Sequence, residues 1–183
     1  AEQLVMESFA GFDPAMADLA APFFAQNWID AAPRAGKSSG AFSHPVTPSA
    51  HPYILMNFSG KSRDVMTLAH EMGHGIHQRL AADRGYLMSD TPLTLAETAS
   101  VFAEMLAFRK LVDGTEDVSV RRRLLASKVE DMLNTVVRQI AFHNFETRVH
   151  EARRTAELTA DEISDIWMET QREACLLYTS PSP

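Results

Sequence analysis

The chain has 183 residues and a formal net charge of −7, and hydrophobic residues make up 45% of it. This length suits one domain, and this hydrophobic content can supply a core. The negative charge argues against nucleic acid or an anionic membrane as the main partner, and no apolar run approaches the length of a transmembrane span.

The first element that the sequence predicts is an amphipathic helix over residues 13–24. Two short apolar segments follow, 40–46 and 53–58, each bounded by proline or glycine, and they predict a small antiparallel β-hairpin or sheet. An edge strand here could bind an extended peptide through main-chain hydrogen bonds. The alternative is a strand pair that only covers the core.

The next predicted element is a helix that begins near Ser62 and ends before Gly85. Ser62 is the expected N-cap, and Asp64 complements the helix dipole in the first turn. The apolar residues at helical spacing are Val65, Leu68, Ala69, Met72, Ile76 and Leu80. One face of this helix is therefore expected to pack into a core.

The opposite face of the same helix carries three histidines. At about 100° per residue, His70, His74 and His77 lie largely away from the apolar stripe. Gly73 and Gly75 each cost about 1 kcal/mol in a helix relative to alanine. This cost is easier to understand if another backbone approaches the helix closely at these positions.

A second helix is expected to begin with Thr91 as its cap and Pro92 at its first position. It is apolar on most sides, which predicts a buried helix. It also carries a polar stripe of Glu97, Ser100 and Glu104 at i, i+3 and i+7. Because a buried carboxylate is costly unless it is paired or bound to a metal, this stripe indicates a site.

The rest of the sequence predicts a helical scaffold and an unrelated tail. A long periodic helix covers 118 to about 153, and a capping box of Thr159 and Glu162 opens a last helix through Trp167. Residues 175–183 leave the helical pattern abruptly and resemble the in-frame translation of a sequencing adapter, so they are expected not to be native. They include the only cysteine, so no disulfide or thiol chemistry is expected.

The segment 70–74 reads H-E-M-G-H and carries the clearest chemical signal. Positions i and i+4 of a helix face the same side, so His70 and His74 can bind one zinc ion and leave room for a third ligand and a water. Glu71, beside the first histidine, is then placed to act as the general base. The alternative is a helix whose histidines are only hydrogen-bonded.

The second helix offers the third ligand. Glu97 follows His74 by 23 residues, which lets the first helix finish, turn and return antiparallel. Glu104, one heptad further on, is the competing ligand, and we interpret it as supporting a ligand or pairing with a cation. His77 lies about 10 Å along the helix axis from His70, so we assign it a supporting or substrate-facing role. A hydrogen-bonded structural histidine is the alternative for His77.

Together these motifs resemble the oligoendopeptidase F and thimet oligopeptidase family of zinc metallopeptidases, most closely its oligoendopeptidase F branch. The matching segments are 28–30, 36–43, 52–58, 64–77, 96–100, 138–139 and 145–146. The combination of H-E-M-G-H with A-E-T-A-S is highly specific, and the similarity runs from about residue 20 to residue 174.

This resemblance implies a mainly α fold, with a zincin-type helical catalytic core and a small sheet before the zinc-binding helix. It implies one Zn²⁺ ion held by the residues that match His70, His74 and Glu97, with Glu71 as the general base. It also implies peptide substrates of limited length, cleaved internally within a deep channel, and a location in the bacterial cytoplasm.

Further site residues are expected around this centre. Gly40, Ala41 and Phe42 belong to the matched segment before the zinc helix and are expected to bind substrate or support the site. The same expectation applies to His77 and Glu104.

Residues 1–174 are expected to be a partial catalytic domain, truncated at both ends. The family's His and Tyr residues that stabilise the tetrahedral intermediate lie beyond the matched segment. Two hypotheses follow: a zinc-dependent endopeptidase seen as its catalytic core, or a zinc-binding helical fragment without useful turnover. The sequence leaves the oligomeric state open.

Overall fold

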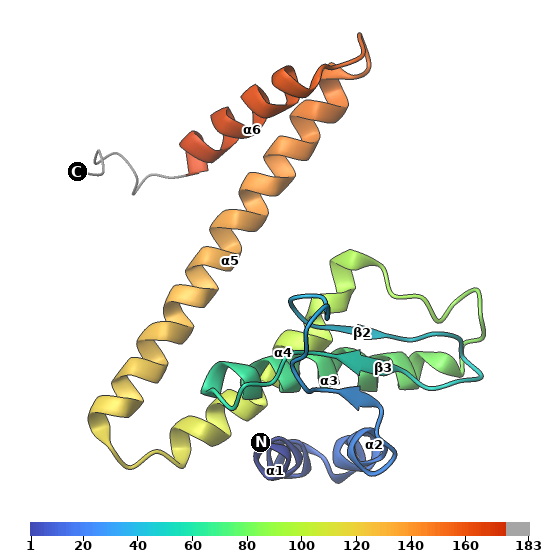
Figure 1. Cartoon of the computed structure of the whole chain (residues 1–183), viewed down its shortest axis with the longest axis vertical. Coiled ribbons are helices and arrows are strands. Elements are labelled where there is room, and N and C mark those ends of the chain that lie inside the picture. The colour runs from blue at the N-terminus through green and yellow to red at the C-terminus, as the bar shows by residue number, and fades with distance from the viewer. Residues whose placement is uncertain (175–183) are drawn as a thin grey trace. The chain divides into compact units, whose positions relative to one another are not determined.

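The computed structural model describes residues 1–174, which form a mainly α fold with a small sheet, as expected (Figure 1). In chain order the elements are α1 (Glu2–Phe12), α2 (Pro14–Ala25), β1 (Ile29–Asp30), β2 (Phe42–His44), β3 (Tyr53–Leu55), α3 (Ser62–Ala82), α4 (Leu93–Asp113), α5 (Val118–Ala152) and α6 (Ala160–Ala174). They divide into two compact units, residues 1–116 and the residues from Asp117 onward. The tail at 175–183 lies outside the described residues. Among the described helices, none combines the length and apolar character that crossing a membrane requires.

The sheet contains the predicted antiparallel pair and one strand that the sequence did not reveal. Its order is β1-β3-β2, with β2 antiparallel and β1 parallel to the central strand β3. Both predicted strands are shorter than the apolar segments that suggested them. Gly40 has φ +89° and precedes β2, while Pro45 follows it and has no N–H for a ladder. The two residues of β1 are too few to show a periodic pattern.

A buried ammonium group holds the connection that leads into β2. The Lys37 side chain is only 1% exposed. Its Nζ donates to the main-chain oxygens of Asp30 (2.9 Å), Ala32 (3.0 Å) and Met56 (2.6 Å), and to the Asp30 carboxylate (3.0 Å). Lys37 therefore links the ends of β1 and β3 to the loop before β2.

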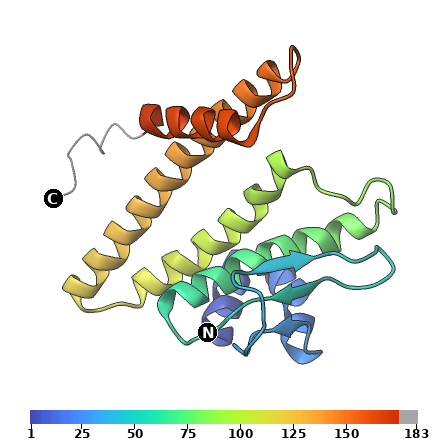
Figure 2. The same ribbon diagram turned by 45° about the horizontal axis from the view of Figure 1, so that its top comes forward.

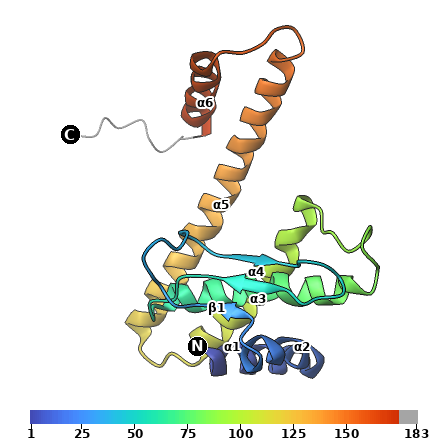
Figure 3. The same ribbon diagram turned by 45° about the vertical axis from the view of Figure 1, so that its right-hand side comes forward.

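Helix α3 lies at the centre of the first unit, with the sheet on one side and α1 and α2 on another (Figure 3). The core residues are Val5, Phe9, Ala20, Phe23, Trp28, Ile54, Met56, Leu68, Ala69, Met72, Ile76, Ala103 and Ala107. The predicted apolar stripe of α3 is thus buried in its middle. The prediction is wrong at Leu80, which is 57% exposed because no described element covers it.

Both predicted N-caps near the site are displaced by one residue. Ser62 is the first residue of α3, and the cap position belongs to Lys61. The Asp64 carboxylate accepts from the main-chain N–H groups of Ser59 (2.7 Å) and Lys61 (3.0 Å), so a serine cap is not required. Pro92 has an extended conformation and is itself the cap of α4 rather than its first helical residue.

Helices α3 and α4 pack side by side at very short range (Figure 2). A Cβ added to Gly73 would lie 2.6 Å from the Ala99 oxygen and 2.7 Å from the Ser100 Cα. One added to Gly75 would lie 2.6 Å from the Phe23 ring. The close approach that the two glycines predicted is therefore present at both. At Gly73 the neighbour is the backbone of α4, and at Gly75 it is the aromatic side chain of Phe23.

Only one side of α4 is buried among the described residues. Ser100, Ala103, Ala107, Phe108 and Val112 are buried, whereas Leu93, Leu95, Val101 and Phe102 are exposed. The prediction of a helix buried on most sides is therefore wrong for the described part of the chain. An apolar composition indicates burial only where another element is present to cover it.

The second unit is a hairpin of α5 and α6. Phe142 and Phe145 of α5 contact the Trp167 ring at centroid distances of 5.7 and 5.2 Å. The predicted capping box is confirmed, since Thr159 N–H donates to Glu162 (2.8 Å) and Glu162 N–H donates to Thr159 Oγ1 (3.3 Å). The last helix runs beyond Trp167 to Ala174, because good helix formers follow it.

We expect Gly73→Ala to destabilise the chain, although alanine is the better helix former. Its Cβ would meet the backbone of α4, and overpacking of this kind costs about 1–3 kcal/mol against a propensity gain of about 1 kcal/mol. Urea unfolding followed by circular dichroism measures the change. Gly11→Ala is the matched control, because no atom lies within 4 Å of its added Cβ. A Gly73→Ala protein as stable as the control would contradict the close contact.

Candidate metal centre and general base

Helix α3 places His70 and His74 on one face, and α4 brings Glu97 to them. The two imidazole rings lie edge to face, with centroids 5.1 Å apart. Glu97 Oε2 lies 3.1 Å from His70 Nε2 and 3.5 Å from His74 Nε2. One donor atom from each of the three residues lies within 4.8 Å of the other two, so the group could hold a metal ion.

Glu97 does not have the environment that the sequence suggested. Its side chain is 63% exposed, so the argument from a buried carboxylate is wrong for this residue. The carboxylate is held instead by its neighbour one turn along, because Ser100 Oγ donates to Glu97 Oε2 at 2.7 Å. Ser100 was recognised only as part of a polar stripe, and its i+3 spacing from Glu97 is the signal that could have identified this contact.

Glu104 lies on the other side of the His70 ring. Its Oε2 is 3.2 Å from His70 Nδ1, and its side chain is less exposed than that of Glu97. The two carboxylates of α4 therefore lie beside different nitrogens of the His70 ring: Glu97 beside Nε2 and Glu104 beside Nδ1. In this arrangement Glu104 orients the ring, while Glu97 shares the Nε2 side with His74.

Glu71 is buried beside this group, between α3 and the sheet. Burial raises the pKa of Glu71 to about 6, and the Glu97 charge adds to the rise, while His70 and a hydrogen bond from the Ser43 backbone lower it. A carboxyl group with this pKa is ionised at neutral pH and is a stronger base than an exposed glutamate.

The two histidines differ in protonation behaviour. Burial alone would lower the pKa of His70, but the hydrogen bond to Glu104 and the nearby carboxylates raise it above its usual value. Burial lowers the pKa of His74, and the charges of His70 and His77 lower it further, against the effect of Glu97. His74 therefore favours the neutral form that a metal ligand needs.

His77 is half-buried on the same face, one turn beyond His74. No hydrogen bond joins its ring to another described residue. Among the described residues, the donor atoms that converge as a possible metal site come from His70, His74 and Glu97, and His77 is not one of them.

The other predicted contacts lie along the approach to β2. Gly40 and Ala41 precede the strand, and only Phe42 belongs to it, with its side chain exposed. Asn57 Nδ2 donates to the Gly40 oxygen at 3.3 Å, which fixes this loop. Among the described residues, no hydrogen bond or ion pair joins any of the three to His70, His74 or Glu97.

The residue that joins the sheet to the site is Ser43, which the sequence did not single out. Ser43 Oγ donates to Gln78 Oε1 (2.8 Å), and Gln78 Nε2 donates to the Ser43 oxygen (3.1 Å). Ile54 N–H donates to the main-chain oxygen of Trp28, the residue before β1, so the main-chain groups of Ser43, its partner on β2, point away from β3. On that side, Gln78 donates to the Ser43 oxygen and the Ser43 backbone is hydrogen-bonded to Glu71. Side chains alternate between the two faces of a strand, and within 42–44 only Ser43 faces α3. This alternation is the sequence signal that could have identified Ser43.

Comparison with known proteins matches this chain to one family. Residues 13–182 match peptidase family M3. An oligoendopeptidase F homolog of Lactococcus lactis subsp. lactis is 32% identical over 162 residues, which are 87% of this chain and 27% of that protein. An oligoendopeptidase F homolog of Borreliella burgdorferi is 33% identical over 128 residues, 69% of this chain and 22% of that protein.

A solved structure agrees in fold. PZ peptidase A with inhibitor 2 superposes with a TM-score of 0.77 at 19% identity, over 94% of this chain and 30% of that one. The chain thus spans about a quarter of the length of the curated relatives that it matches.

We expect Glu104→Gln to lower the pKa of His70 in the metal-free protein, because the hydrogen bond to a charged acceptor is lost. The histidine resonances in an NMR titration report this shift. The pKa of His74 should change much less, and Glu2→Gln, an exposed change in α1, should leave both unchanged. A His70 titration that is insensitive to Glu104→Gln would show that the two groups do not interact.

Proposed function

The chain belongs to peptidase family M3, and on that premise we propose that it carries the catalytic centre of a zinc-dependent endopeptidase. Its substrates are oligopeptides cleaved at internal bonds. The observation that carries the proposal is the convergence of His70, His74 and Glu97 beside a buried Glu71.

The three donors fit zinc. Two ligand atoms bound to one tetrahedral zinc at about 2.0–2.2 Å lie about 3.3–3.6 Å apart. The distance from Glu97 Oε2 to His74 Nε2, 3.5 Å, lies in this range, and that to His70 Nε2, 3.1 Å, lies about 0.2 Å below it. Two imidazoles and one carboxylate are also a donor set typical of catalytic zinc, which keeps one position open.

Zinc, when bound there, supplies a Lewis acid for the scissile carbonyl and lowers the pKa of water. Glu71 supplies the proton transfer: its carboxylate takes the proton of the attacking water and passes it to the leaving amine. Its raised pKa supports this role, because a base is most effective when its pKa lies near the working pH.

The neighbouring polar groups position the ligands. Glu104 accepts from His70 Nδ1 and so presents Nε2 to the metal, and Ser100 Oγ holds the Glu97 carboxylate. Such partners fix the tautomer and the orientation of a ligand. A peptide that lies along β2 would pass Ala41 and Ser43 and come beside Glu71.

The alternative is a zinc-binding fragment without useful turnover. The chain spans 27% of its Lactococcus relative, and the family's residues that stabilise the tetrahedral intermediate lie beyond the matched segment. Losing one such donor costs about 10²–10³ in rate. We therefore assign the activity to a protein of the relatives' length. A cytoplasmic location remains part of the proposal, and the oligomeric state is open.

We expect His70→Ala, His74→Ala and Glu97→Ala each to abolish stoichiometric zinc, because three ligands leave no redundancy. Glu104→Gln should keep the site but weaken zinc affinity about 10–100-fold, the usual effect of losing a group that orients a ligand. Metal analysis and competition with a chelator measure both effects. Full zinc content in Glu97→Ala, with loss in Glu104→Ala, would assign the third ligand to Glu104.

We expect Glu71→Gln in the full-length protein to retain zinc and lose nearly all peptide hydrolysis, because an amide cannot accept the proton of water. Turnover of a quenched fluorescent peptide, together with metal analysis of the same sample, tests this. His77→Ala should retain zinc and lower activity or stability. A Glu71→Gln protein that turns over at the wild-type rate would remove Glu71 from the mechanism.

A further inference from the structure

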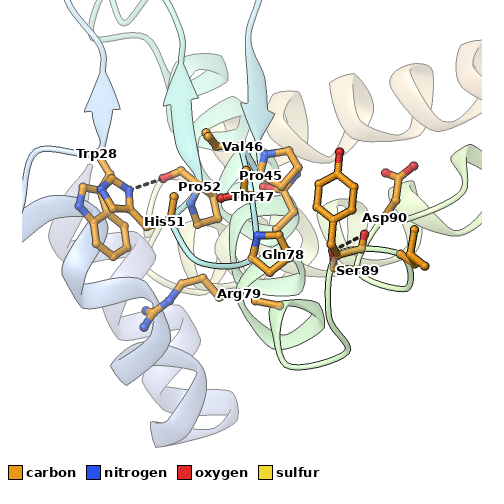
Figure 4. Close-up of a pocket in the computed structure, with 15 residues that line it drawn as sticks. Trp28, Pro45, Val46, Thr47, His51, Pro52, Gln78, Arg79, Ser89 and Asp90 are labelled. Atoms are coloured by element: carbon orange, nitrogen blue, oxygen red, sulfur yellow. Dashed lines mark hydrogen bonds between the residues drawn. The ribbon is translucent and has the colours of Figure 1, made fainter.

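A cavity of about 540 Å³ opens at the C-terminal end of α3, outside the proposed metal centre (Figure 4). Residues 45–52, which connect β2 to β3, form one side of it, and residues 86–90, which connect α3 to α4, form the other. All of its lining residues belong to the first compact unit.

One wall of the cavity is preformed and aromatic. The Trp28 ring is buried and stacks on His51, with centroids 3.9 Å apart and an interplanar angle of 8°. The Arg79 guanidinium lies 5.5 Å from the centre of the Trp28 ring and donates to the main-chain oxygen of Leu19. The guanidinium group of Arg79 is therefore occupied by the Trp28 ring and the Leu19 oxygen. In this position it supports the aromatic wall and is not a free cation for an occupant of the cavity.

The loop over this wall is rigid and contains a strained residue. Pro45, Pro48 and Pro52 restrict its backbone. Val46, a β-branched residue, has φ +63°, lines the cavity and is 47% exposed. Such a conformation costs roughly 1–3 kcal/mol, and strained residues of this kind cluster at active sites, ligand clamps and switch regions.

The facing side is apolar and uncovered. Tyr86 is 75% exposed and Leu87 is 88% exposed. Large apolar side chains left open beside a preformed aromatic wall indicate an apolar occupant. Asp90 is the carboxylate that lines the same cavity, so an acidic occupant is disfavoured.

One side chain connects the cavity to the general base. Gln78 lines the cavity and exchanges two hydrogen bonds with Ser43, whose backbone is also hydrogen-bonded to Glu71. Pro45, where the cavity begins on the strand side, is two residues beyond Ser43, roughly 7 Å along an extended chain. An extended peptide with its cleaved bond at Glu71 therefore reaches the cavity after about two or three residues.

We propose that this cavity receives a large apolar side chain of the peptide substrate, about two or three residues from the cleaved bond. The inference rests on the proposed endopeptidase function and names the substrate feature that the site selects. The proposed metal centre acts on the peptide bond, which all peptides share. A preference for particular side chains must therefore come from another surface, such as this cavity.

The test uses the full-length protein and quenched fluorescent peptides that share one cleavage site, verified by mass spectrometry. The peptides differ only at the positions two and three residues from the cleaved bond, on either side, which carry Phe, Gly or Asp. At one of these positions, the wild-type protein should cleave the Phe peptide with kcat/KM about 10–100-fold above the Gly peptide, since burial of such a side chain contributes on this scale. The Asp peptide should be the poorest.

Two variants locate this preference. Leu87→Ser removes apolar surface from the open side, and Ala82→Phe fills the cavity from the last turn of α3. Both should abolish most of the preference for Phe while the Gly peptide is still cleaved. Leu80→Ser is the matched control for Leu87→Ser. Leu80 is likewise an exposed leucine, but it lies on α3 and does not line the cavity, so this variant should keep the full preference.

The outcomes separate the two proposals. If hydrolysis depends on Glu71 but shows no Phe preference, or if Leu87→Ser and Ala82→Phe keep it, the cavity is not the subsite although the peptidase proposal stands. If no peptide is cleaved in a Glu71-dependent way, both proposals are wrong. An equal loss of preference in Leu80→Ser would point to a general disturbance of α3 and would also overturn the assignment.

Discussion

The candidate site depends on the absence of a side chain at Gly73. Because the backbone of α4 lies where a Cβ would be, the two helices approach closely at Ala99 and Ser100. Ser100 has two roles in this contact: its Cα lies against Gly73, and its Oγ holds the Glu97 carboxylate. Ser100, which packs against Gly73, thus also holds Glu97, the one proposed ligand among the described residues that does not come from α3. A separation larger by the width of one methyl group would move Glu97 away from both imidazoles.

On its other side, α3 is fixed by the sheet and α2, and this packing gives Glu71 its properties. Phe23 lies against Gly75, and Ser43 and Gln78 join β2 to the same turn of the helix. The packing buries Glu71, and burial raises its pKa to about 6. The packing that buries Glu71, the proposed general base, therefore also extends from it, through Ser43 and Gln78, to the cavity at the end of β2.

The two carboxylates of α4 show how position, rather than burial, separates their roles. Glu97 is exposed and shares the Nε2 side of His70 with His74, whereas Glu104 lies at Nδ1 and is more buried. Because the Glu97 carboxylate is exposed to solvent, it carries little desolvation cost in the metal-free protein. Glu104 already lies at the His70 ring in the metal-free protein, and its hydrogen bond raises the pKa of His70 there.

The sequence by itself determined what local geometry controls: the helix of the H-E-M-G-H motif, the shared face of His70 and His74, and the capping box at Thr159. It also placed Glu97 and Glu104 on one stripe of the second helix, because helical periodicity requires only one segment. The spacing and the family resemblance favoured Glu97 over Glu104, but helical periodicity alone could not decide which of them meets His70 Nε2. It also could not decide how far the apolar surface of α4 is covered, or that β1 joins the sheet. These features depend on the register and distance between segments that are far apart in the chain. Tertiary packing at Gly73 sets that register, and no pattern within either helix encodes it.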